Sequence, residues 1–214
     1  MLASLLDLLF PRRSLTGTHG CFVTNGEYAA LAGPPVVQRK EELRGRGLDA
    51  LDCLRAASWY EGDLLKRAIK TLKYRRVRRL AEVLGDLVVE KVVGRMEMEN
   101  DGVVLCPVPL HWTRRFARGF NQAELIARAV SGRTGIPVAR LLRRTRPTGS
   151  QTKRRRVERL KALDDAFAVA ARNVPVRVVL MDDLSTTGAT LNECARVLKA
   201  AGAEHVEGWV VAHG

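Results

Sequence analysis

The chain lacks several features that would assign it to other protein classes. No apolar run in its 214 residues approaches the ~20 residues that a membrane-spanning helix needs, because Asp, Arg or Lys interrupts each hydrophobic segment. The apolar N-terminus precedes the Arg12-Arg13 pair, the reverse of a secretory signal, and is expected to form a short helix. A twin-arginine export signal is the weaker alternative, because polar residues follow the pair. The sequence predicts a soluble, cytoplasmic protein without a membrane partner.

Cysteine and aromatic residues are scarce. The four cysteines, Cys21, Cys53, Cys106 and Cys194, form no CxxC pair, which argues against a disulfide scaffold and fits a reducing compartment. Cys106 and Cys194 fall in predicted regular elements and are expected to be small buried residues. Aromatic residues make up only 5% of the chain, which weakens any interpretation as a protein that binds nucleic acid mainly by stacking.

Acidic residues are almost missing from two stretches that hold the excess charge. Residues 66–79 contain eight basic and no acidic residues, and residues 143–161 contain nine basic residues and only Glu158. The whole chain carries +13, so the remainder is slightly acidic. Such a concentration of charge attracts phosphates or nucleic acid, whereas a solvated surface without a partner is the simpler alternative.

Hydrophobic periodicity divides the chain into a loop-rich N-terminal appendage, residues 1–59, and a main domain, residues 60–214. Glycine and proline punctuate the appendage. Helical spacing then predicts two amphipathic helices over about 65–72 and 80–88. A third helix is predicted to begin at Asn121, with Glu124 as its capping-box partner, and a fourth to run from about Thr190 to Ala201. Strands are predicted at 103–106, 138–142, 166–170, 177–181 and 206–212. This alternation indicates an α/β fold with a mainly parallel central sheet flanked by helices.

The segment 178–191 contains the strongest functional signal. An apolar strand ends in two adjacent carboxylates, Asp182 and Asp183, which can accept hydrogen bonds from the vicinal hydroxyls of a ribose. The loop that follows, Thr186-Thr187-Gly188-Ala189-Thr190, offers amides, hydroxyls and a helix N-terminus that suit a phosphate group. The alternative is that the acids are turn residues and that Thr190 and Glu193 form a capping box.

This segment resembles the phosphoribosyl pyrophosphate motif of type I phosphoribosyltransferases, and earlier motifs resemble the ComF family of bacterial competence-associated proteins. These motifs are Cys106-Pro-Val-Pro-Leu-His111, Arg114-Arg115, Arg118-Gly-Phe-Asn-Gln122, Arg144-Thr-Arg-Pro-Thr148, Gln151-Thr152 and Ala166-Phe167. They follow one another in the expected order from about Tyr60 to the C-terminus. The resemblance implies the type I phosphoribosyltransferase fold with a flexible hood loop that closes over the substrate.

The resemblance also implies roles for individual residues. Asp182 and Asp183 would bind the ribose of phosphoribosyl pyrophosphate, and residues 186–190 would bind its phosphate. The residues implied for pyrophosphate are Arg114, Arg115 and Arg118, and those implied for the hood are Arg144, Gln151, Lys153, Arg154 and Arg159. A nitrogen nucleophile would displace pyrophosphate from the anomeric carbon, with magnesium bridging substrate oxygens. No catalytic residue is assigned.

Two departures from the family pattern stand out. Many members carry an N-terminal four-cysteine zinc module, but only Cys21 and Cys53 precede the main domain here, so no zinc is expected. In the hood, Lys153-Arg-Arg-Arg156 replaces a less basic stretch, and Ala162 stands where Asn is frequent. The acceptor base stays open, as does the homodimer that is common among relatives.

The competing function is that of a nucleic-acid-binding accessory factor for DNA uptake. The phosphates of single-stranded DNA would contact the basic helix and the arginine-rich loop. The candidate stacking platforms are Tyr74, Trp112, Phe116 and Phe120, although these rings are expected mainly in the core. A phosphoribosyltransferase, or a non-catalytic domain that binds phosphoribosyl pyrophosphate, is the preferred prediction.

Overall fold

A five-stranded sheet organises the protein in the computed structural model, which describes residues 13–19, 21–75, 77–95, 102–111, 113, 116, 118–145 and 166–214. The predicted N-terminal helix lies outside these residues. In chain order the elements are α2 (Asn25–Leu31), β1 (Val36–Arg39), α3 (Lys40–Gly45), β2 (Cys53–Trp59), α4 (Asp63–Arg75), α5 (Leu80–Lys91), the 3-10 turn η1 (Val93–Arg95), β3 (Val103–Pro107), α7 (Gln122–Thr134), β4 (Leu142–Arg144), β5 (Phe167–Val169), β6 (Arg177–Ser185), α9 (Ala189–Ala200) and β7 (His205–His213).

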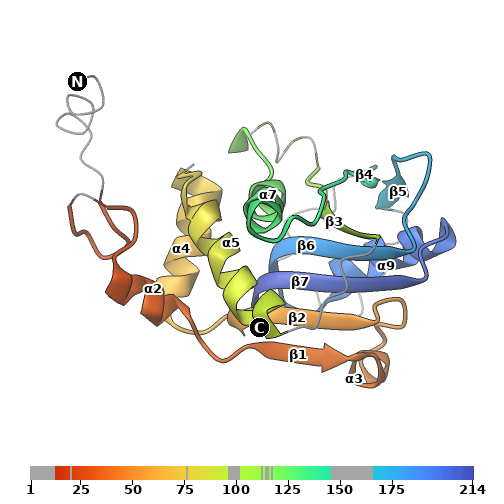
Figure 1. Ribbon diagram of the computed structural model, residues 1–214, viewed down its shortest axis with the longest axis horizontal. Coiled ribbons are helices and arrows are strands. Elements are labelled where there is room, and N and C mark those ends of the chain that lie inside the picture. Colours follow the sequence, from red (N-terminus) through yellow and green to blue (C-terminus); the bar gives the residue numbers. More distant parts are fainter. Residues whose placement is uncertain are drawn as a thin grey trace.

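The sheet is mixed and has the strand order β1-β2-β7-β6-β3 (Figure 1). Strands β2, β7, β6 and β3 are parallel, whereas β1 pairs with β2 in the antiparallel sense. A separate two-stranded sheet joins β4 to β5. The structure therefore confirms an α/β fold with a mainly parallel central sheet.

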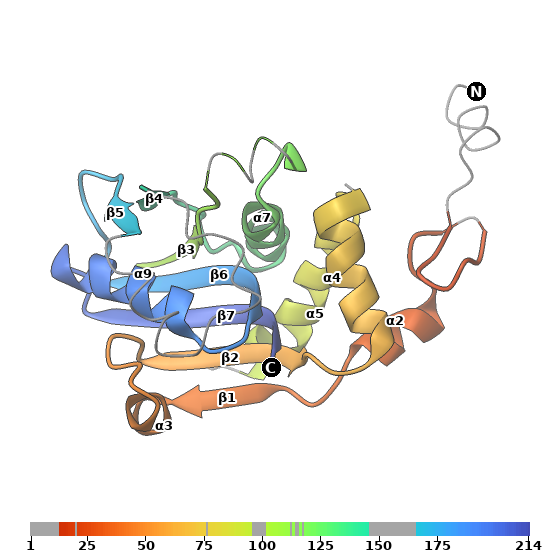
Figure 2. The ribbon, with the colours of Figure 1, turned by 180° about the vertical axis from the view of Figure 1, so that it is seen from behind.

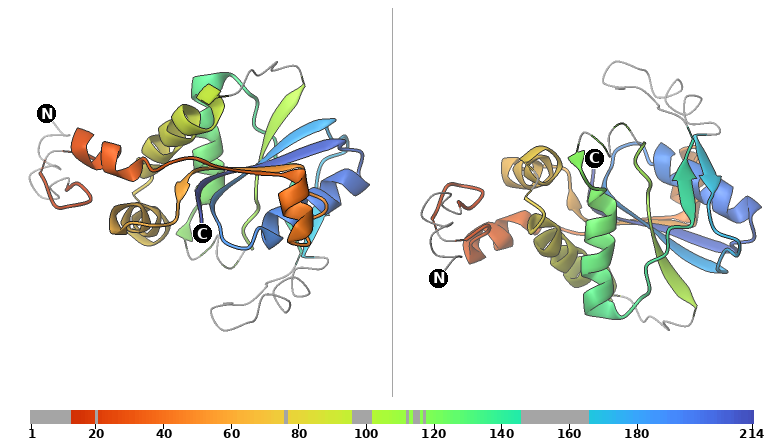
Figure 3. Two further views of the ribbon diagram at one scale, coloured as in Figure 1. Left: turned by 90° about the horizontal axis from the view of Figure 1, so that it is seen from below. Right: turned by 90° about the horizontal axis from the view of Figure 1, so that it is seen from above.

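Helices cover both faces of the sheet. Helices α5 and α7 pack on one face, with α4 beside α5, and α9 packs on the other, as the views from the front, the back and the two edges show (Figures 1, 2 and 3). Side chains of strand β7 point alternately to the two faces of the sheet. Trp209 and Val211 belong to the apolar cluster under α5 and α7, while Val206 and Val210 belong to the cluster under α9. Both faces are buried, which accounts for the uninterrupted apolar runs.

Most predicted elements of the main domain are confirmed. Asn121 caps α7 by accepting a hydrogen bond from the Ala123 N–H at 3.1 Å, and the helix ends at Gly135, whose φ is +76°. Glu124 does not complete the expected capping box, because its carboxylate pairs with Arg128 and Arg140. The strand predicted at 138–142 is reduced to one bridge between residues 105 and 138, and β4 begins only at residue 142. Cys106 and Cys194 are buried, as expected.

The loop-rich character predicted for residues 1–59 is wrong for residues 36–59. Strands β1 and β2 are part of the central sheet, and β2 lies between β1 and β7. Leu54 and Ala56 are fully buried in the cluster under α9, so this segment completes the core of the main domain. The glycines and prolines around these strands gave the impression of a continuous loop because each strand is short.

Candidate functional site

The two adjacent carboxylates lie within strand β6, whose pairing with β7 continues from Arg177 to Ser185. The strand is therefore four residues longer than the apolar run 177–181 predicted. Because side chains alternate along a strand, Asp182 and Asp183 start from opposite faces of the sheet. Asp182 lies on the α9 face and Asp183 on the face covered by α4 and α7. Sequence adjacency alone did not reveal this separation.

Asp183 is nearly fully buried, with 2% of its surface exposed, and it is held by two helices. Lys73 of α4 forms an ion pair with Oδ2, and the Gln122 side chain of α7 donates a hydrogen bond to Oδ1 at 3.1 Å. A buried carboxylate requires such partners, because removal from water is costly without them. Asp183 thus joins α4 and α7 to the central sheet.

Asp182 has a different environment. One carboxylate oxygen accepts a hydrogen bond from the backbone N–H of Asp183 at 2.8 Å. Burial raises the pKa of Asp182 well above its ordinary value, and the nearby charge of Asp183 raises it further, while Lys73 acts in the opposite direction. The side chain retains partial solvent exposure. It is therefore the more accessible of the two acids to a polar ligand.

The loop after β6 leads into helix α9 through Gly188. This glycine is the N-cap, with φ of +80°, and a Cβ atom placed on it would lie 2.7 Å from Leu48 Cδ1. The Ala189 N–H donates to Thr187 Oγ1 at 3.4 Å, and the next amides of the first turn have no carbonyl acceptor one turn earlier, as at any helix start. The alternative of a capping box between Thr190 and Glu193 is wrong, because the N-cap is Gly188 and Glu193 pairs with Arg196.

Arg118, implied for pyrophosphate, is connected to the acidic pair. Its Nη1 donates to Oε1 of Gln122 at 3.1 Å, and the same Gln122 amide donates to Asp183. The Arg118 guanidinium also lies over the Tyr74 ring, 5.3 Å from its centroid. The structure therefore brings Arg118 and Asp183 together through one side chain. Arg114 and Arg115 lie outside the described residues.

The hood residues are only partly described. Arg144 ends β4, and its guanidinium lies 5.1 Å from the ring centroid of Phe167 on the paired strand β5. Gln151, Lys153, Arg154 and Arg159 lie outside the described residues. The short sheet formed by β4 and β5 therefore holds the two flanks of the hood segment next to each other.

Sequence reasoning missed Lys73 and Gln122 as site residues. Lys73 was interpreted only as part of a basic helix, and Gln122 only as the end of a family motif, because their contact with Asp183 spans elements far apart in the chain. The prediction that the aromatic rings lie mainly in the core is also partly wrong. Tyr74 is 70% exposed and Phe116 is 87% exposed, whereas Phe120 is buried. Trp112 lies outside the described residues.

Metal and membrane features were searched across the same part of the chain. Within the described ranges, no three His, Cys, Asp or Glu side chains gather as ligands for a metal ion. In that part of the protein, no helix combines the length and the apolar character required to cross a membrane.

These features define an α/β protein with an acidic pair and a glycine-capped helix at the end of a central parallel strand. No family model matches the chain. Competence protein F of Haemophilus influenzae is 37% identical over 112 residues, which are 50% of this chain and 49% of that protein. Competence protein ComFC of Bacillus subtilis is 38% identical over 101 residues, 46% of this chain and 39% of that protein.

A longer match covers about two thirds of the chain. The DNA utilization protein YhgH of Escherichia coli K12 is 30% identical over 150 residues, which are 68% of this chain and 65% of that protein. The chain belongs to the ComF family. Each of these matches covers less than two thirds of the relative's own length.

Proposed function

We propose that the protein binds phosphoribosyl pyrophosphate with magnesium at the carboxyl edge of β6, in a fold of the type I phosphoribosyltransferase kind. The observation that supports this most directly is the succession of Asp182, Asp183 and the Gly188-capped start of α9 at the end of one central strand. Ligands of parallel α/β sheets bind at this edge. The carboxylates suit ribose hydroxyls, and the helix start suits a phosphate dianion.

The two acids have different roles in this proposal. Asp182 is partly exposed and accepts a ribose hydroxyl directly. Asp183 already has Lys73 and Gln122 as partners, so it accepts a hydroxyl when Lys73 turns toward the leaving pyrophosphate. Lys73 and Arg118 then supply positive charge for the pyrophosphate oxygens. A magnesium ion would be held mainly by substrate oxygens and water, because it dehydrates reluctantly, and it would offset the charge of the leaving pyrophosphate.

Transfer to a nitrogen acceptor completes the proposed activity. The nitrogen lone pair forms a bond to the anomeric carbon while the bond from that carbon to pyrophosphate breaks. Pyrophosphate leaves with the bonding electron pair, and the nitrogen loses its proton to solvent. Protein groups contribute orientation and charge stabilisation. A non-catalytic protein would use the same residues for binding alone.

Calorimetric titration with phosphoribosyl pyrophosphate and magnesium tests this proposal. In Asp182→Asn the Kd should rise about tenfold or more, because a charge-assisted hydrogen bond is lost. The matched control is Glu204→Gln, which removes the same charge from an exposed side chain just before β7, at the opposite edge of the sheet. Pyrophosphate alone measures nonspecific attraction to the basic protein. Equal, weak binding of both ligands by wild type and variant would refute the site. Release of pyrophosphate in the presence of candidate bases then tests turnover.

A second candidate function is binding of single-stranded DNA in competence or DNA uptake. Two observations favour it: relatives are named for competence and DNA utilization, and the Tyr74 and Phe116 rings are exposed near Arg118. Exposed rings beside a basic helix are the arrangement on which bases stack. Binding of a short single-stranded oligonucleotide, measured against salt concentration in wild type and Tyr74→Ala, tests this function. Equal affinity in both proteins would count against stacking.

A further inference from the structure

A polar cavity lies at the amino-terminal edge of β2 and β7, away from the acidic pair near the carboxyl edge of β6. Its volume is about 340 Å³, and its lining consists of Val37, Arg39, Lys40, Glu41, Asp52, Cys53, Arg55, His205 and Glu207. On the same face of these strands, Ala57 and Trp209 belong to the apolar core under α5. Along each strand this face of the sheet is polar at the amino-terminal end and apolar farther on, and the cavity lies at the polar end.

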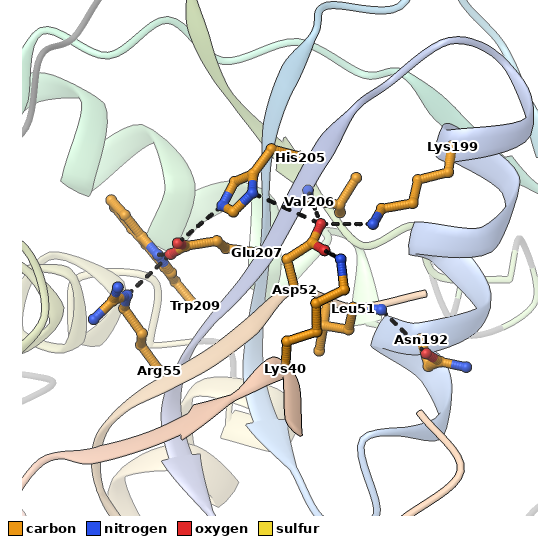
Figure 4. Close-up of polar contacts among 10 residues, drawn as sticks. All are labelled: Lys40, Leu51, Asp52, Arg55, Asn192, Lys199, His205, Val206, Glu207 and Trp209. Atoms are coloured by element: carbon orange, nitrogen blue, oxygen red, sulfur yellow. Dashed lines mark hydrogen bonds and ion pairs between the residues drawn. The ribbon is translucent and has the colours of Figure 1, made fainter. Parts of the chain in front are cut away.

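The two buried acids of this cavity are already neutralised, as Figure 4 shows for both. Asp52 binds Lys40 Nζ at 2.6 Å and Lys199 Nζ at 2.7 Å, and it accepts the Val206 N–H at 2.9 Å. Burial alone would raise the pKa of Asp52, but hydrogen bonds from Lys199 and Lys40 outweigh it and lower the pKa to about 2. This carboxylate therefore stays ionised and serves as a fixed partner for the lysines.

Glu207 is held in a similar way. It accepts hydrogen bonds from Arg55 Nε at 2.9 Å and from the Trp209 ring N–H at 3.0 Å, and His205 Nε2 lies 3.2 Å away (Figure 4). Only Nε of Arg55 is used in this contact. Neither buried acid needs a cation from a ligand.

Two guanidinium groups remain available in the cavity. Within the described residues, the Arg39 side chain makes no hydrogen bond or ion pair, and the Nη atoms of Arg55 have no acceptor. The register of β1 and β2 pairs Val37 with Arg55 and Arg39 with Cys53, so the two arginines are diagonal neighbours on one face. The charged side chains that line the cavity are three cations, Arg39, Lys40 and Arg55, and three carboxylates, Glu41, Asp52 and Glu207, and Lys199 pairs with Asp52 from outside the lining.

We infer that this cavity binds the terminal phosphate group of a small molecule through Arg39 and Arg55. The planar guanidinium fork matches phosphate oxygens, and two such groups offer more N–H donors than the two oxygens of a carboxylate accept. Because Lys40 and Lys199 already neutralise Asp52, the remaining guanidinium N–H groups favour an anion over a neutral ligand. The cavity volume admits a ligand the size of a sugar phosphate. This inference is independent of the function proposed for the carboxyl edge.

Nuclear magnetic resonance titration of the isotope-labelled full chain tests the inference. Inorganic phosphate and ribose 5-phosphate are added at constant ionic strength. The backbone amides of Arg39, Cys53, Arg55 and Glu207 should shift and saturate. In Arg39→Ala the Kd should rise about tenfold or more, because a charge-assisted contact is lost. The Arg39 side chain is exposed and makes no hydrogen bond or ion pair in the free protein, so this variant should fold normally.

The control variant is Arg172→Ala, which removes an exposed arginine outside the cavity and should bind as wild type does. Equal affinity in Arg39→Ala and Arg172→Ala would overturn the inference, as would shifts that never saturate. Shifts confined to residues 186–190 would also overturn it while leaving the function proposed for the carboxyl edge intact. A dinucleotide without a terminal phosphate serves as a further ligand. Binding of it as tightly as ribose 5-phosphate would overturn the assignment to a terminal phosphate.

Discussion

Replacing Glu207 by glutamine should make the free energy of unfolding vary much less with pH in the acidic range. Burial alone would raise the pKa of this carboxyl, but hydrogen bonds from His205, Arg55 and Trp209 outweigh it and lower the pKa from 4.5 to about 2. A shift of this size corresponds to about 3 kcal/mol at neutral pH, which partial exposure of Arg55 and His205 reduces to about 2 kcal/mol.

The sign follows from the lowered pKa. The folded protein holds Glu207 ionised more strongly than the unfolded chain does, so the stabilisation is complete above the ordinary pKa of 4.5. It disappears as the pH falls through about 2. Glu207→Gln should therefore lower the free energy of unfolding by about 2 kcal/mol at pH 7, and the difference from wild type should shrink as the pH falls below 4.5.

Urea denaturation of wild type and variant at a series of pH values measures this difference. The control is Glu204→Gln, because Glu204 is exposed three positions earlier and should change the stability by less than about 0.5 kcal/mol. A difference between wild type and Glu207→Gln that stays constant from pH 7 to pH 2.5 would refute the assigned role of ionisation. A difference equal to that of Glu204→Gln at pH 7 would refute the role of the contacts themselves.

Three further predictions concern the carboxyl edge and its surroundings. Gly188→Ala should lower the free energy of unfolding by about 1–2 kcal/mol in thermal denaturation, because φ is +80° and the new Cβ would meet Leu48; an unchanged melting temperature would contradict this. Lys73→Met should cost about 3 kcal/mol in urea denaturation, because Asp183 would lose its buried partner, and wild-type stability would argue against that ion pair. Phe116→Ala should leave stability within about 0.5 kcal/mol of wild type, since the ring is exposed. If DNA is the ligand, the same variant should weaken oligonucleotide binding by about 1–3 kcal/mol, and unchanged binding would exclude a stacking role for this ring.

Local patterns in the sequence predicted much of the fold correctly. Helices α4, α5 and α9 follow from apolar residues at helical spacing, and α7 follows from its cap Asn121, whose side chain acts on an amide two residues away. The acidic pair was predicted at the end of a strand, but β6 continues past both carboxylates to Ser185, and the loop before α9 follows it. Each of these signals depends on residues that are close together in the chain.

The sequence could not predict features that depend on distant pairings. Strand β2 joins the sheet because it pairs with β7, about 150 residues later, and its own short apolar pattern gave no indication of that partner. The burial of Asp183 between Lys73 and Gln122 likewise requires three separate elements to meet. The exposure of Tyr74 and Phe116 was unexpected, because aromatic residues usually contribute to the core.

The sequence by itself determined the α/β class, the local helices and strands, and the order of chemical groups along β6 and its following loop. It did so because hydrogen bonding and periodic burial along one segment are local properties. Only the tertiary structure decided which side chains neutralise Asp183, Asp52 and Glu207, and which arginines at the amino edge keep free N–H groups. A buried charge is satisfied by whatever the fold brings within hydrogen-bonding distance, and those partners come from elements that the chain order keeps far apart.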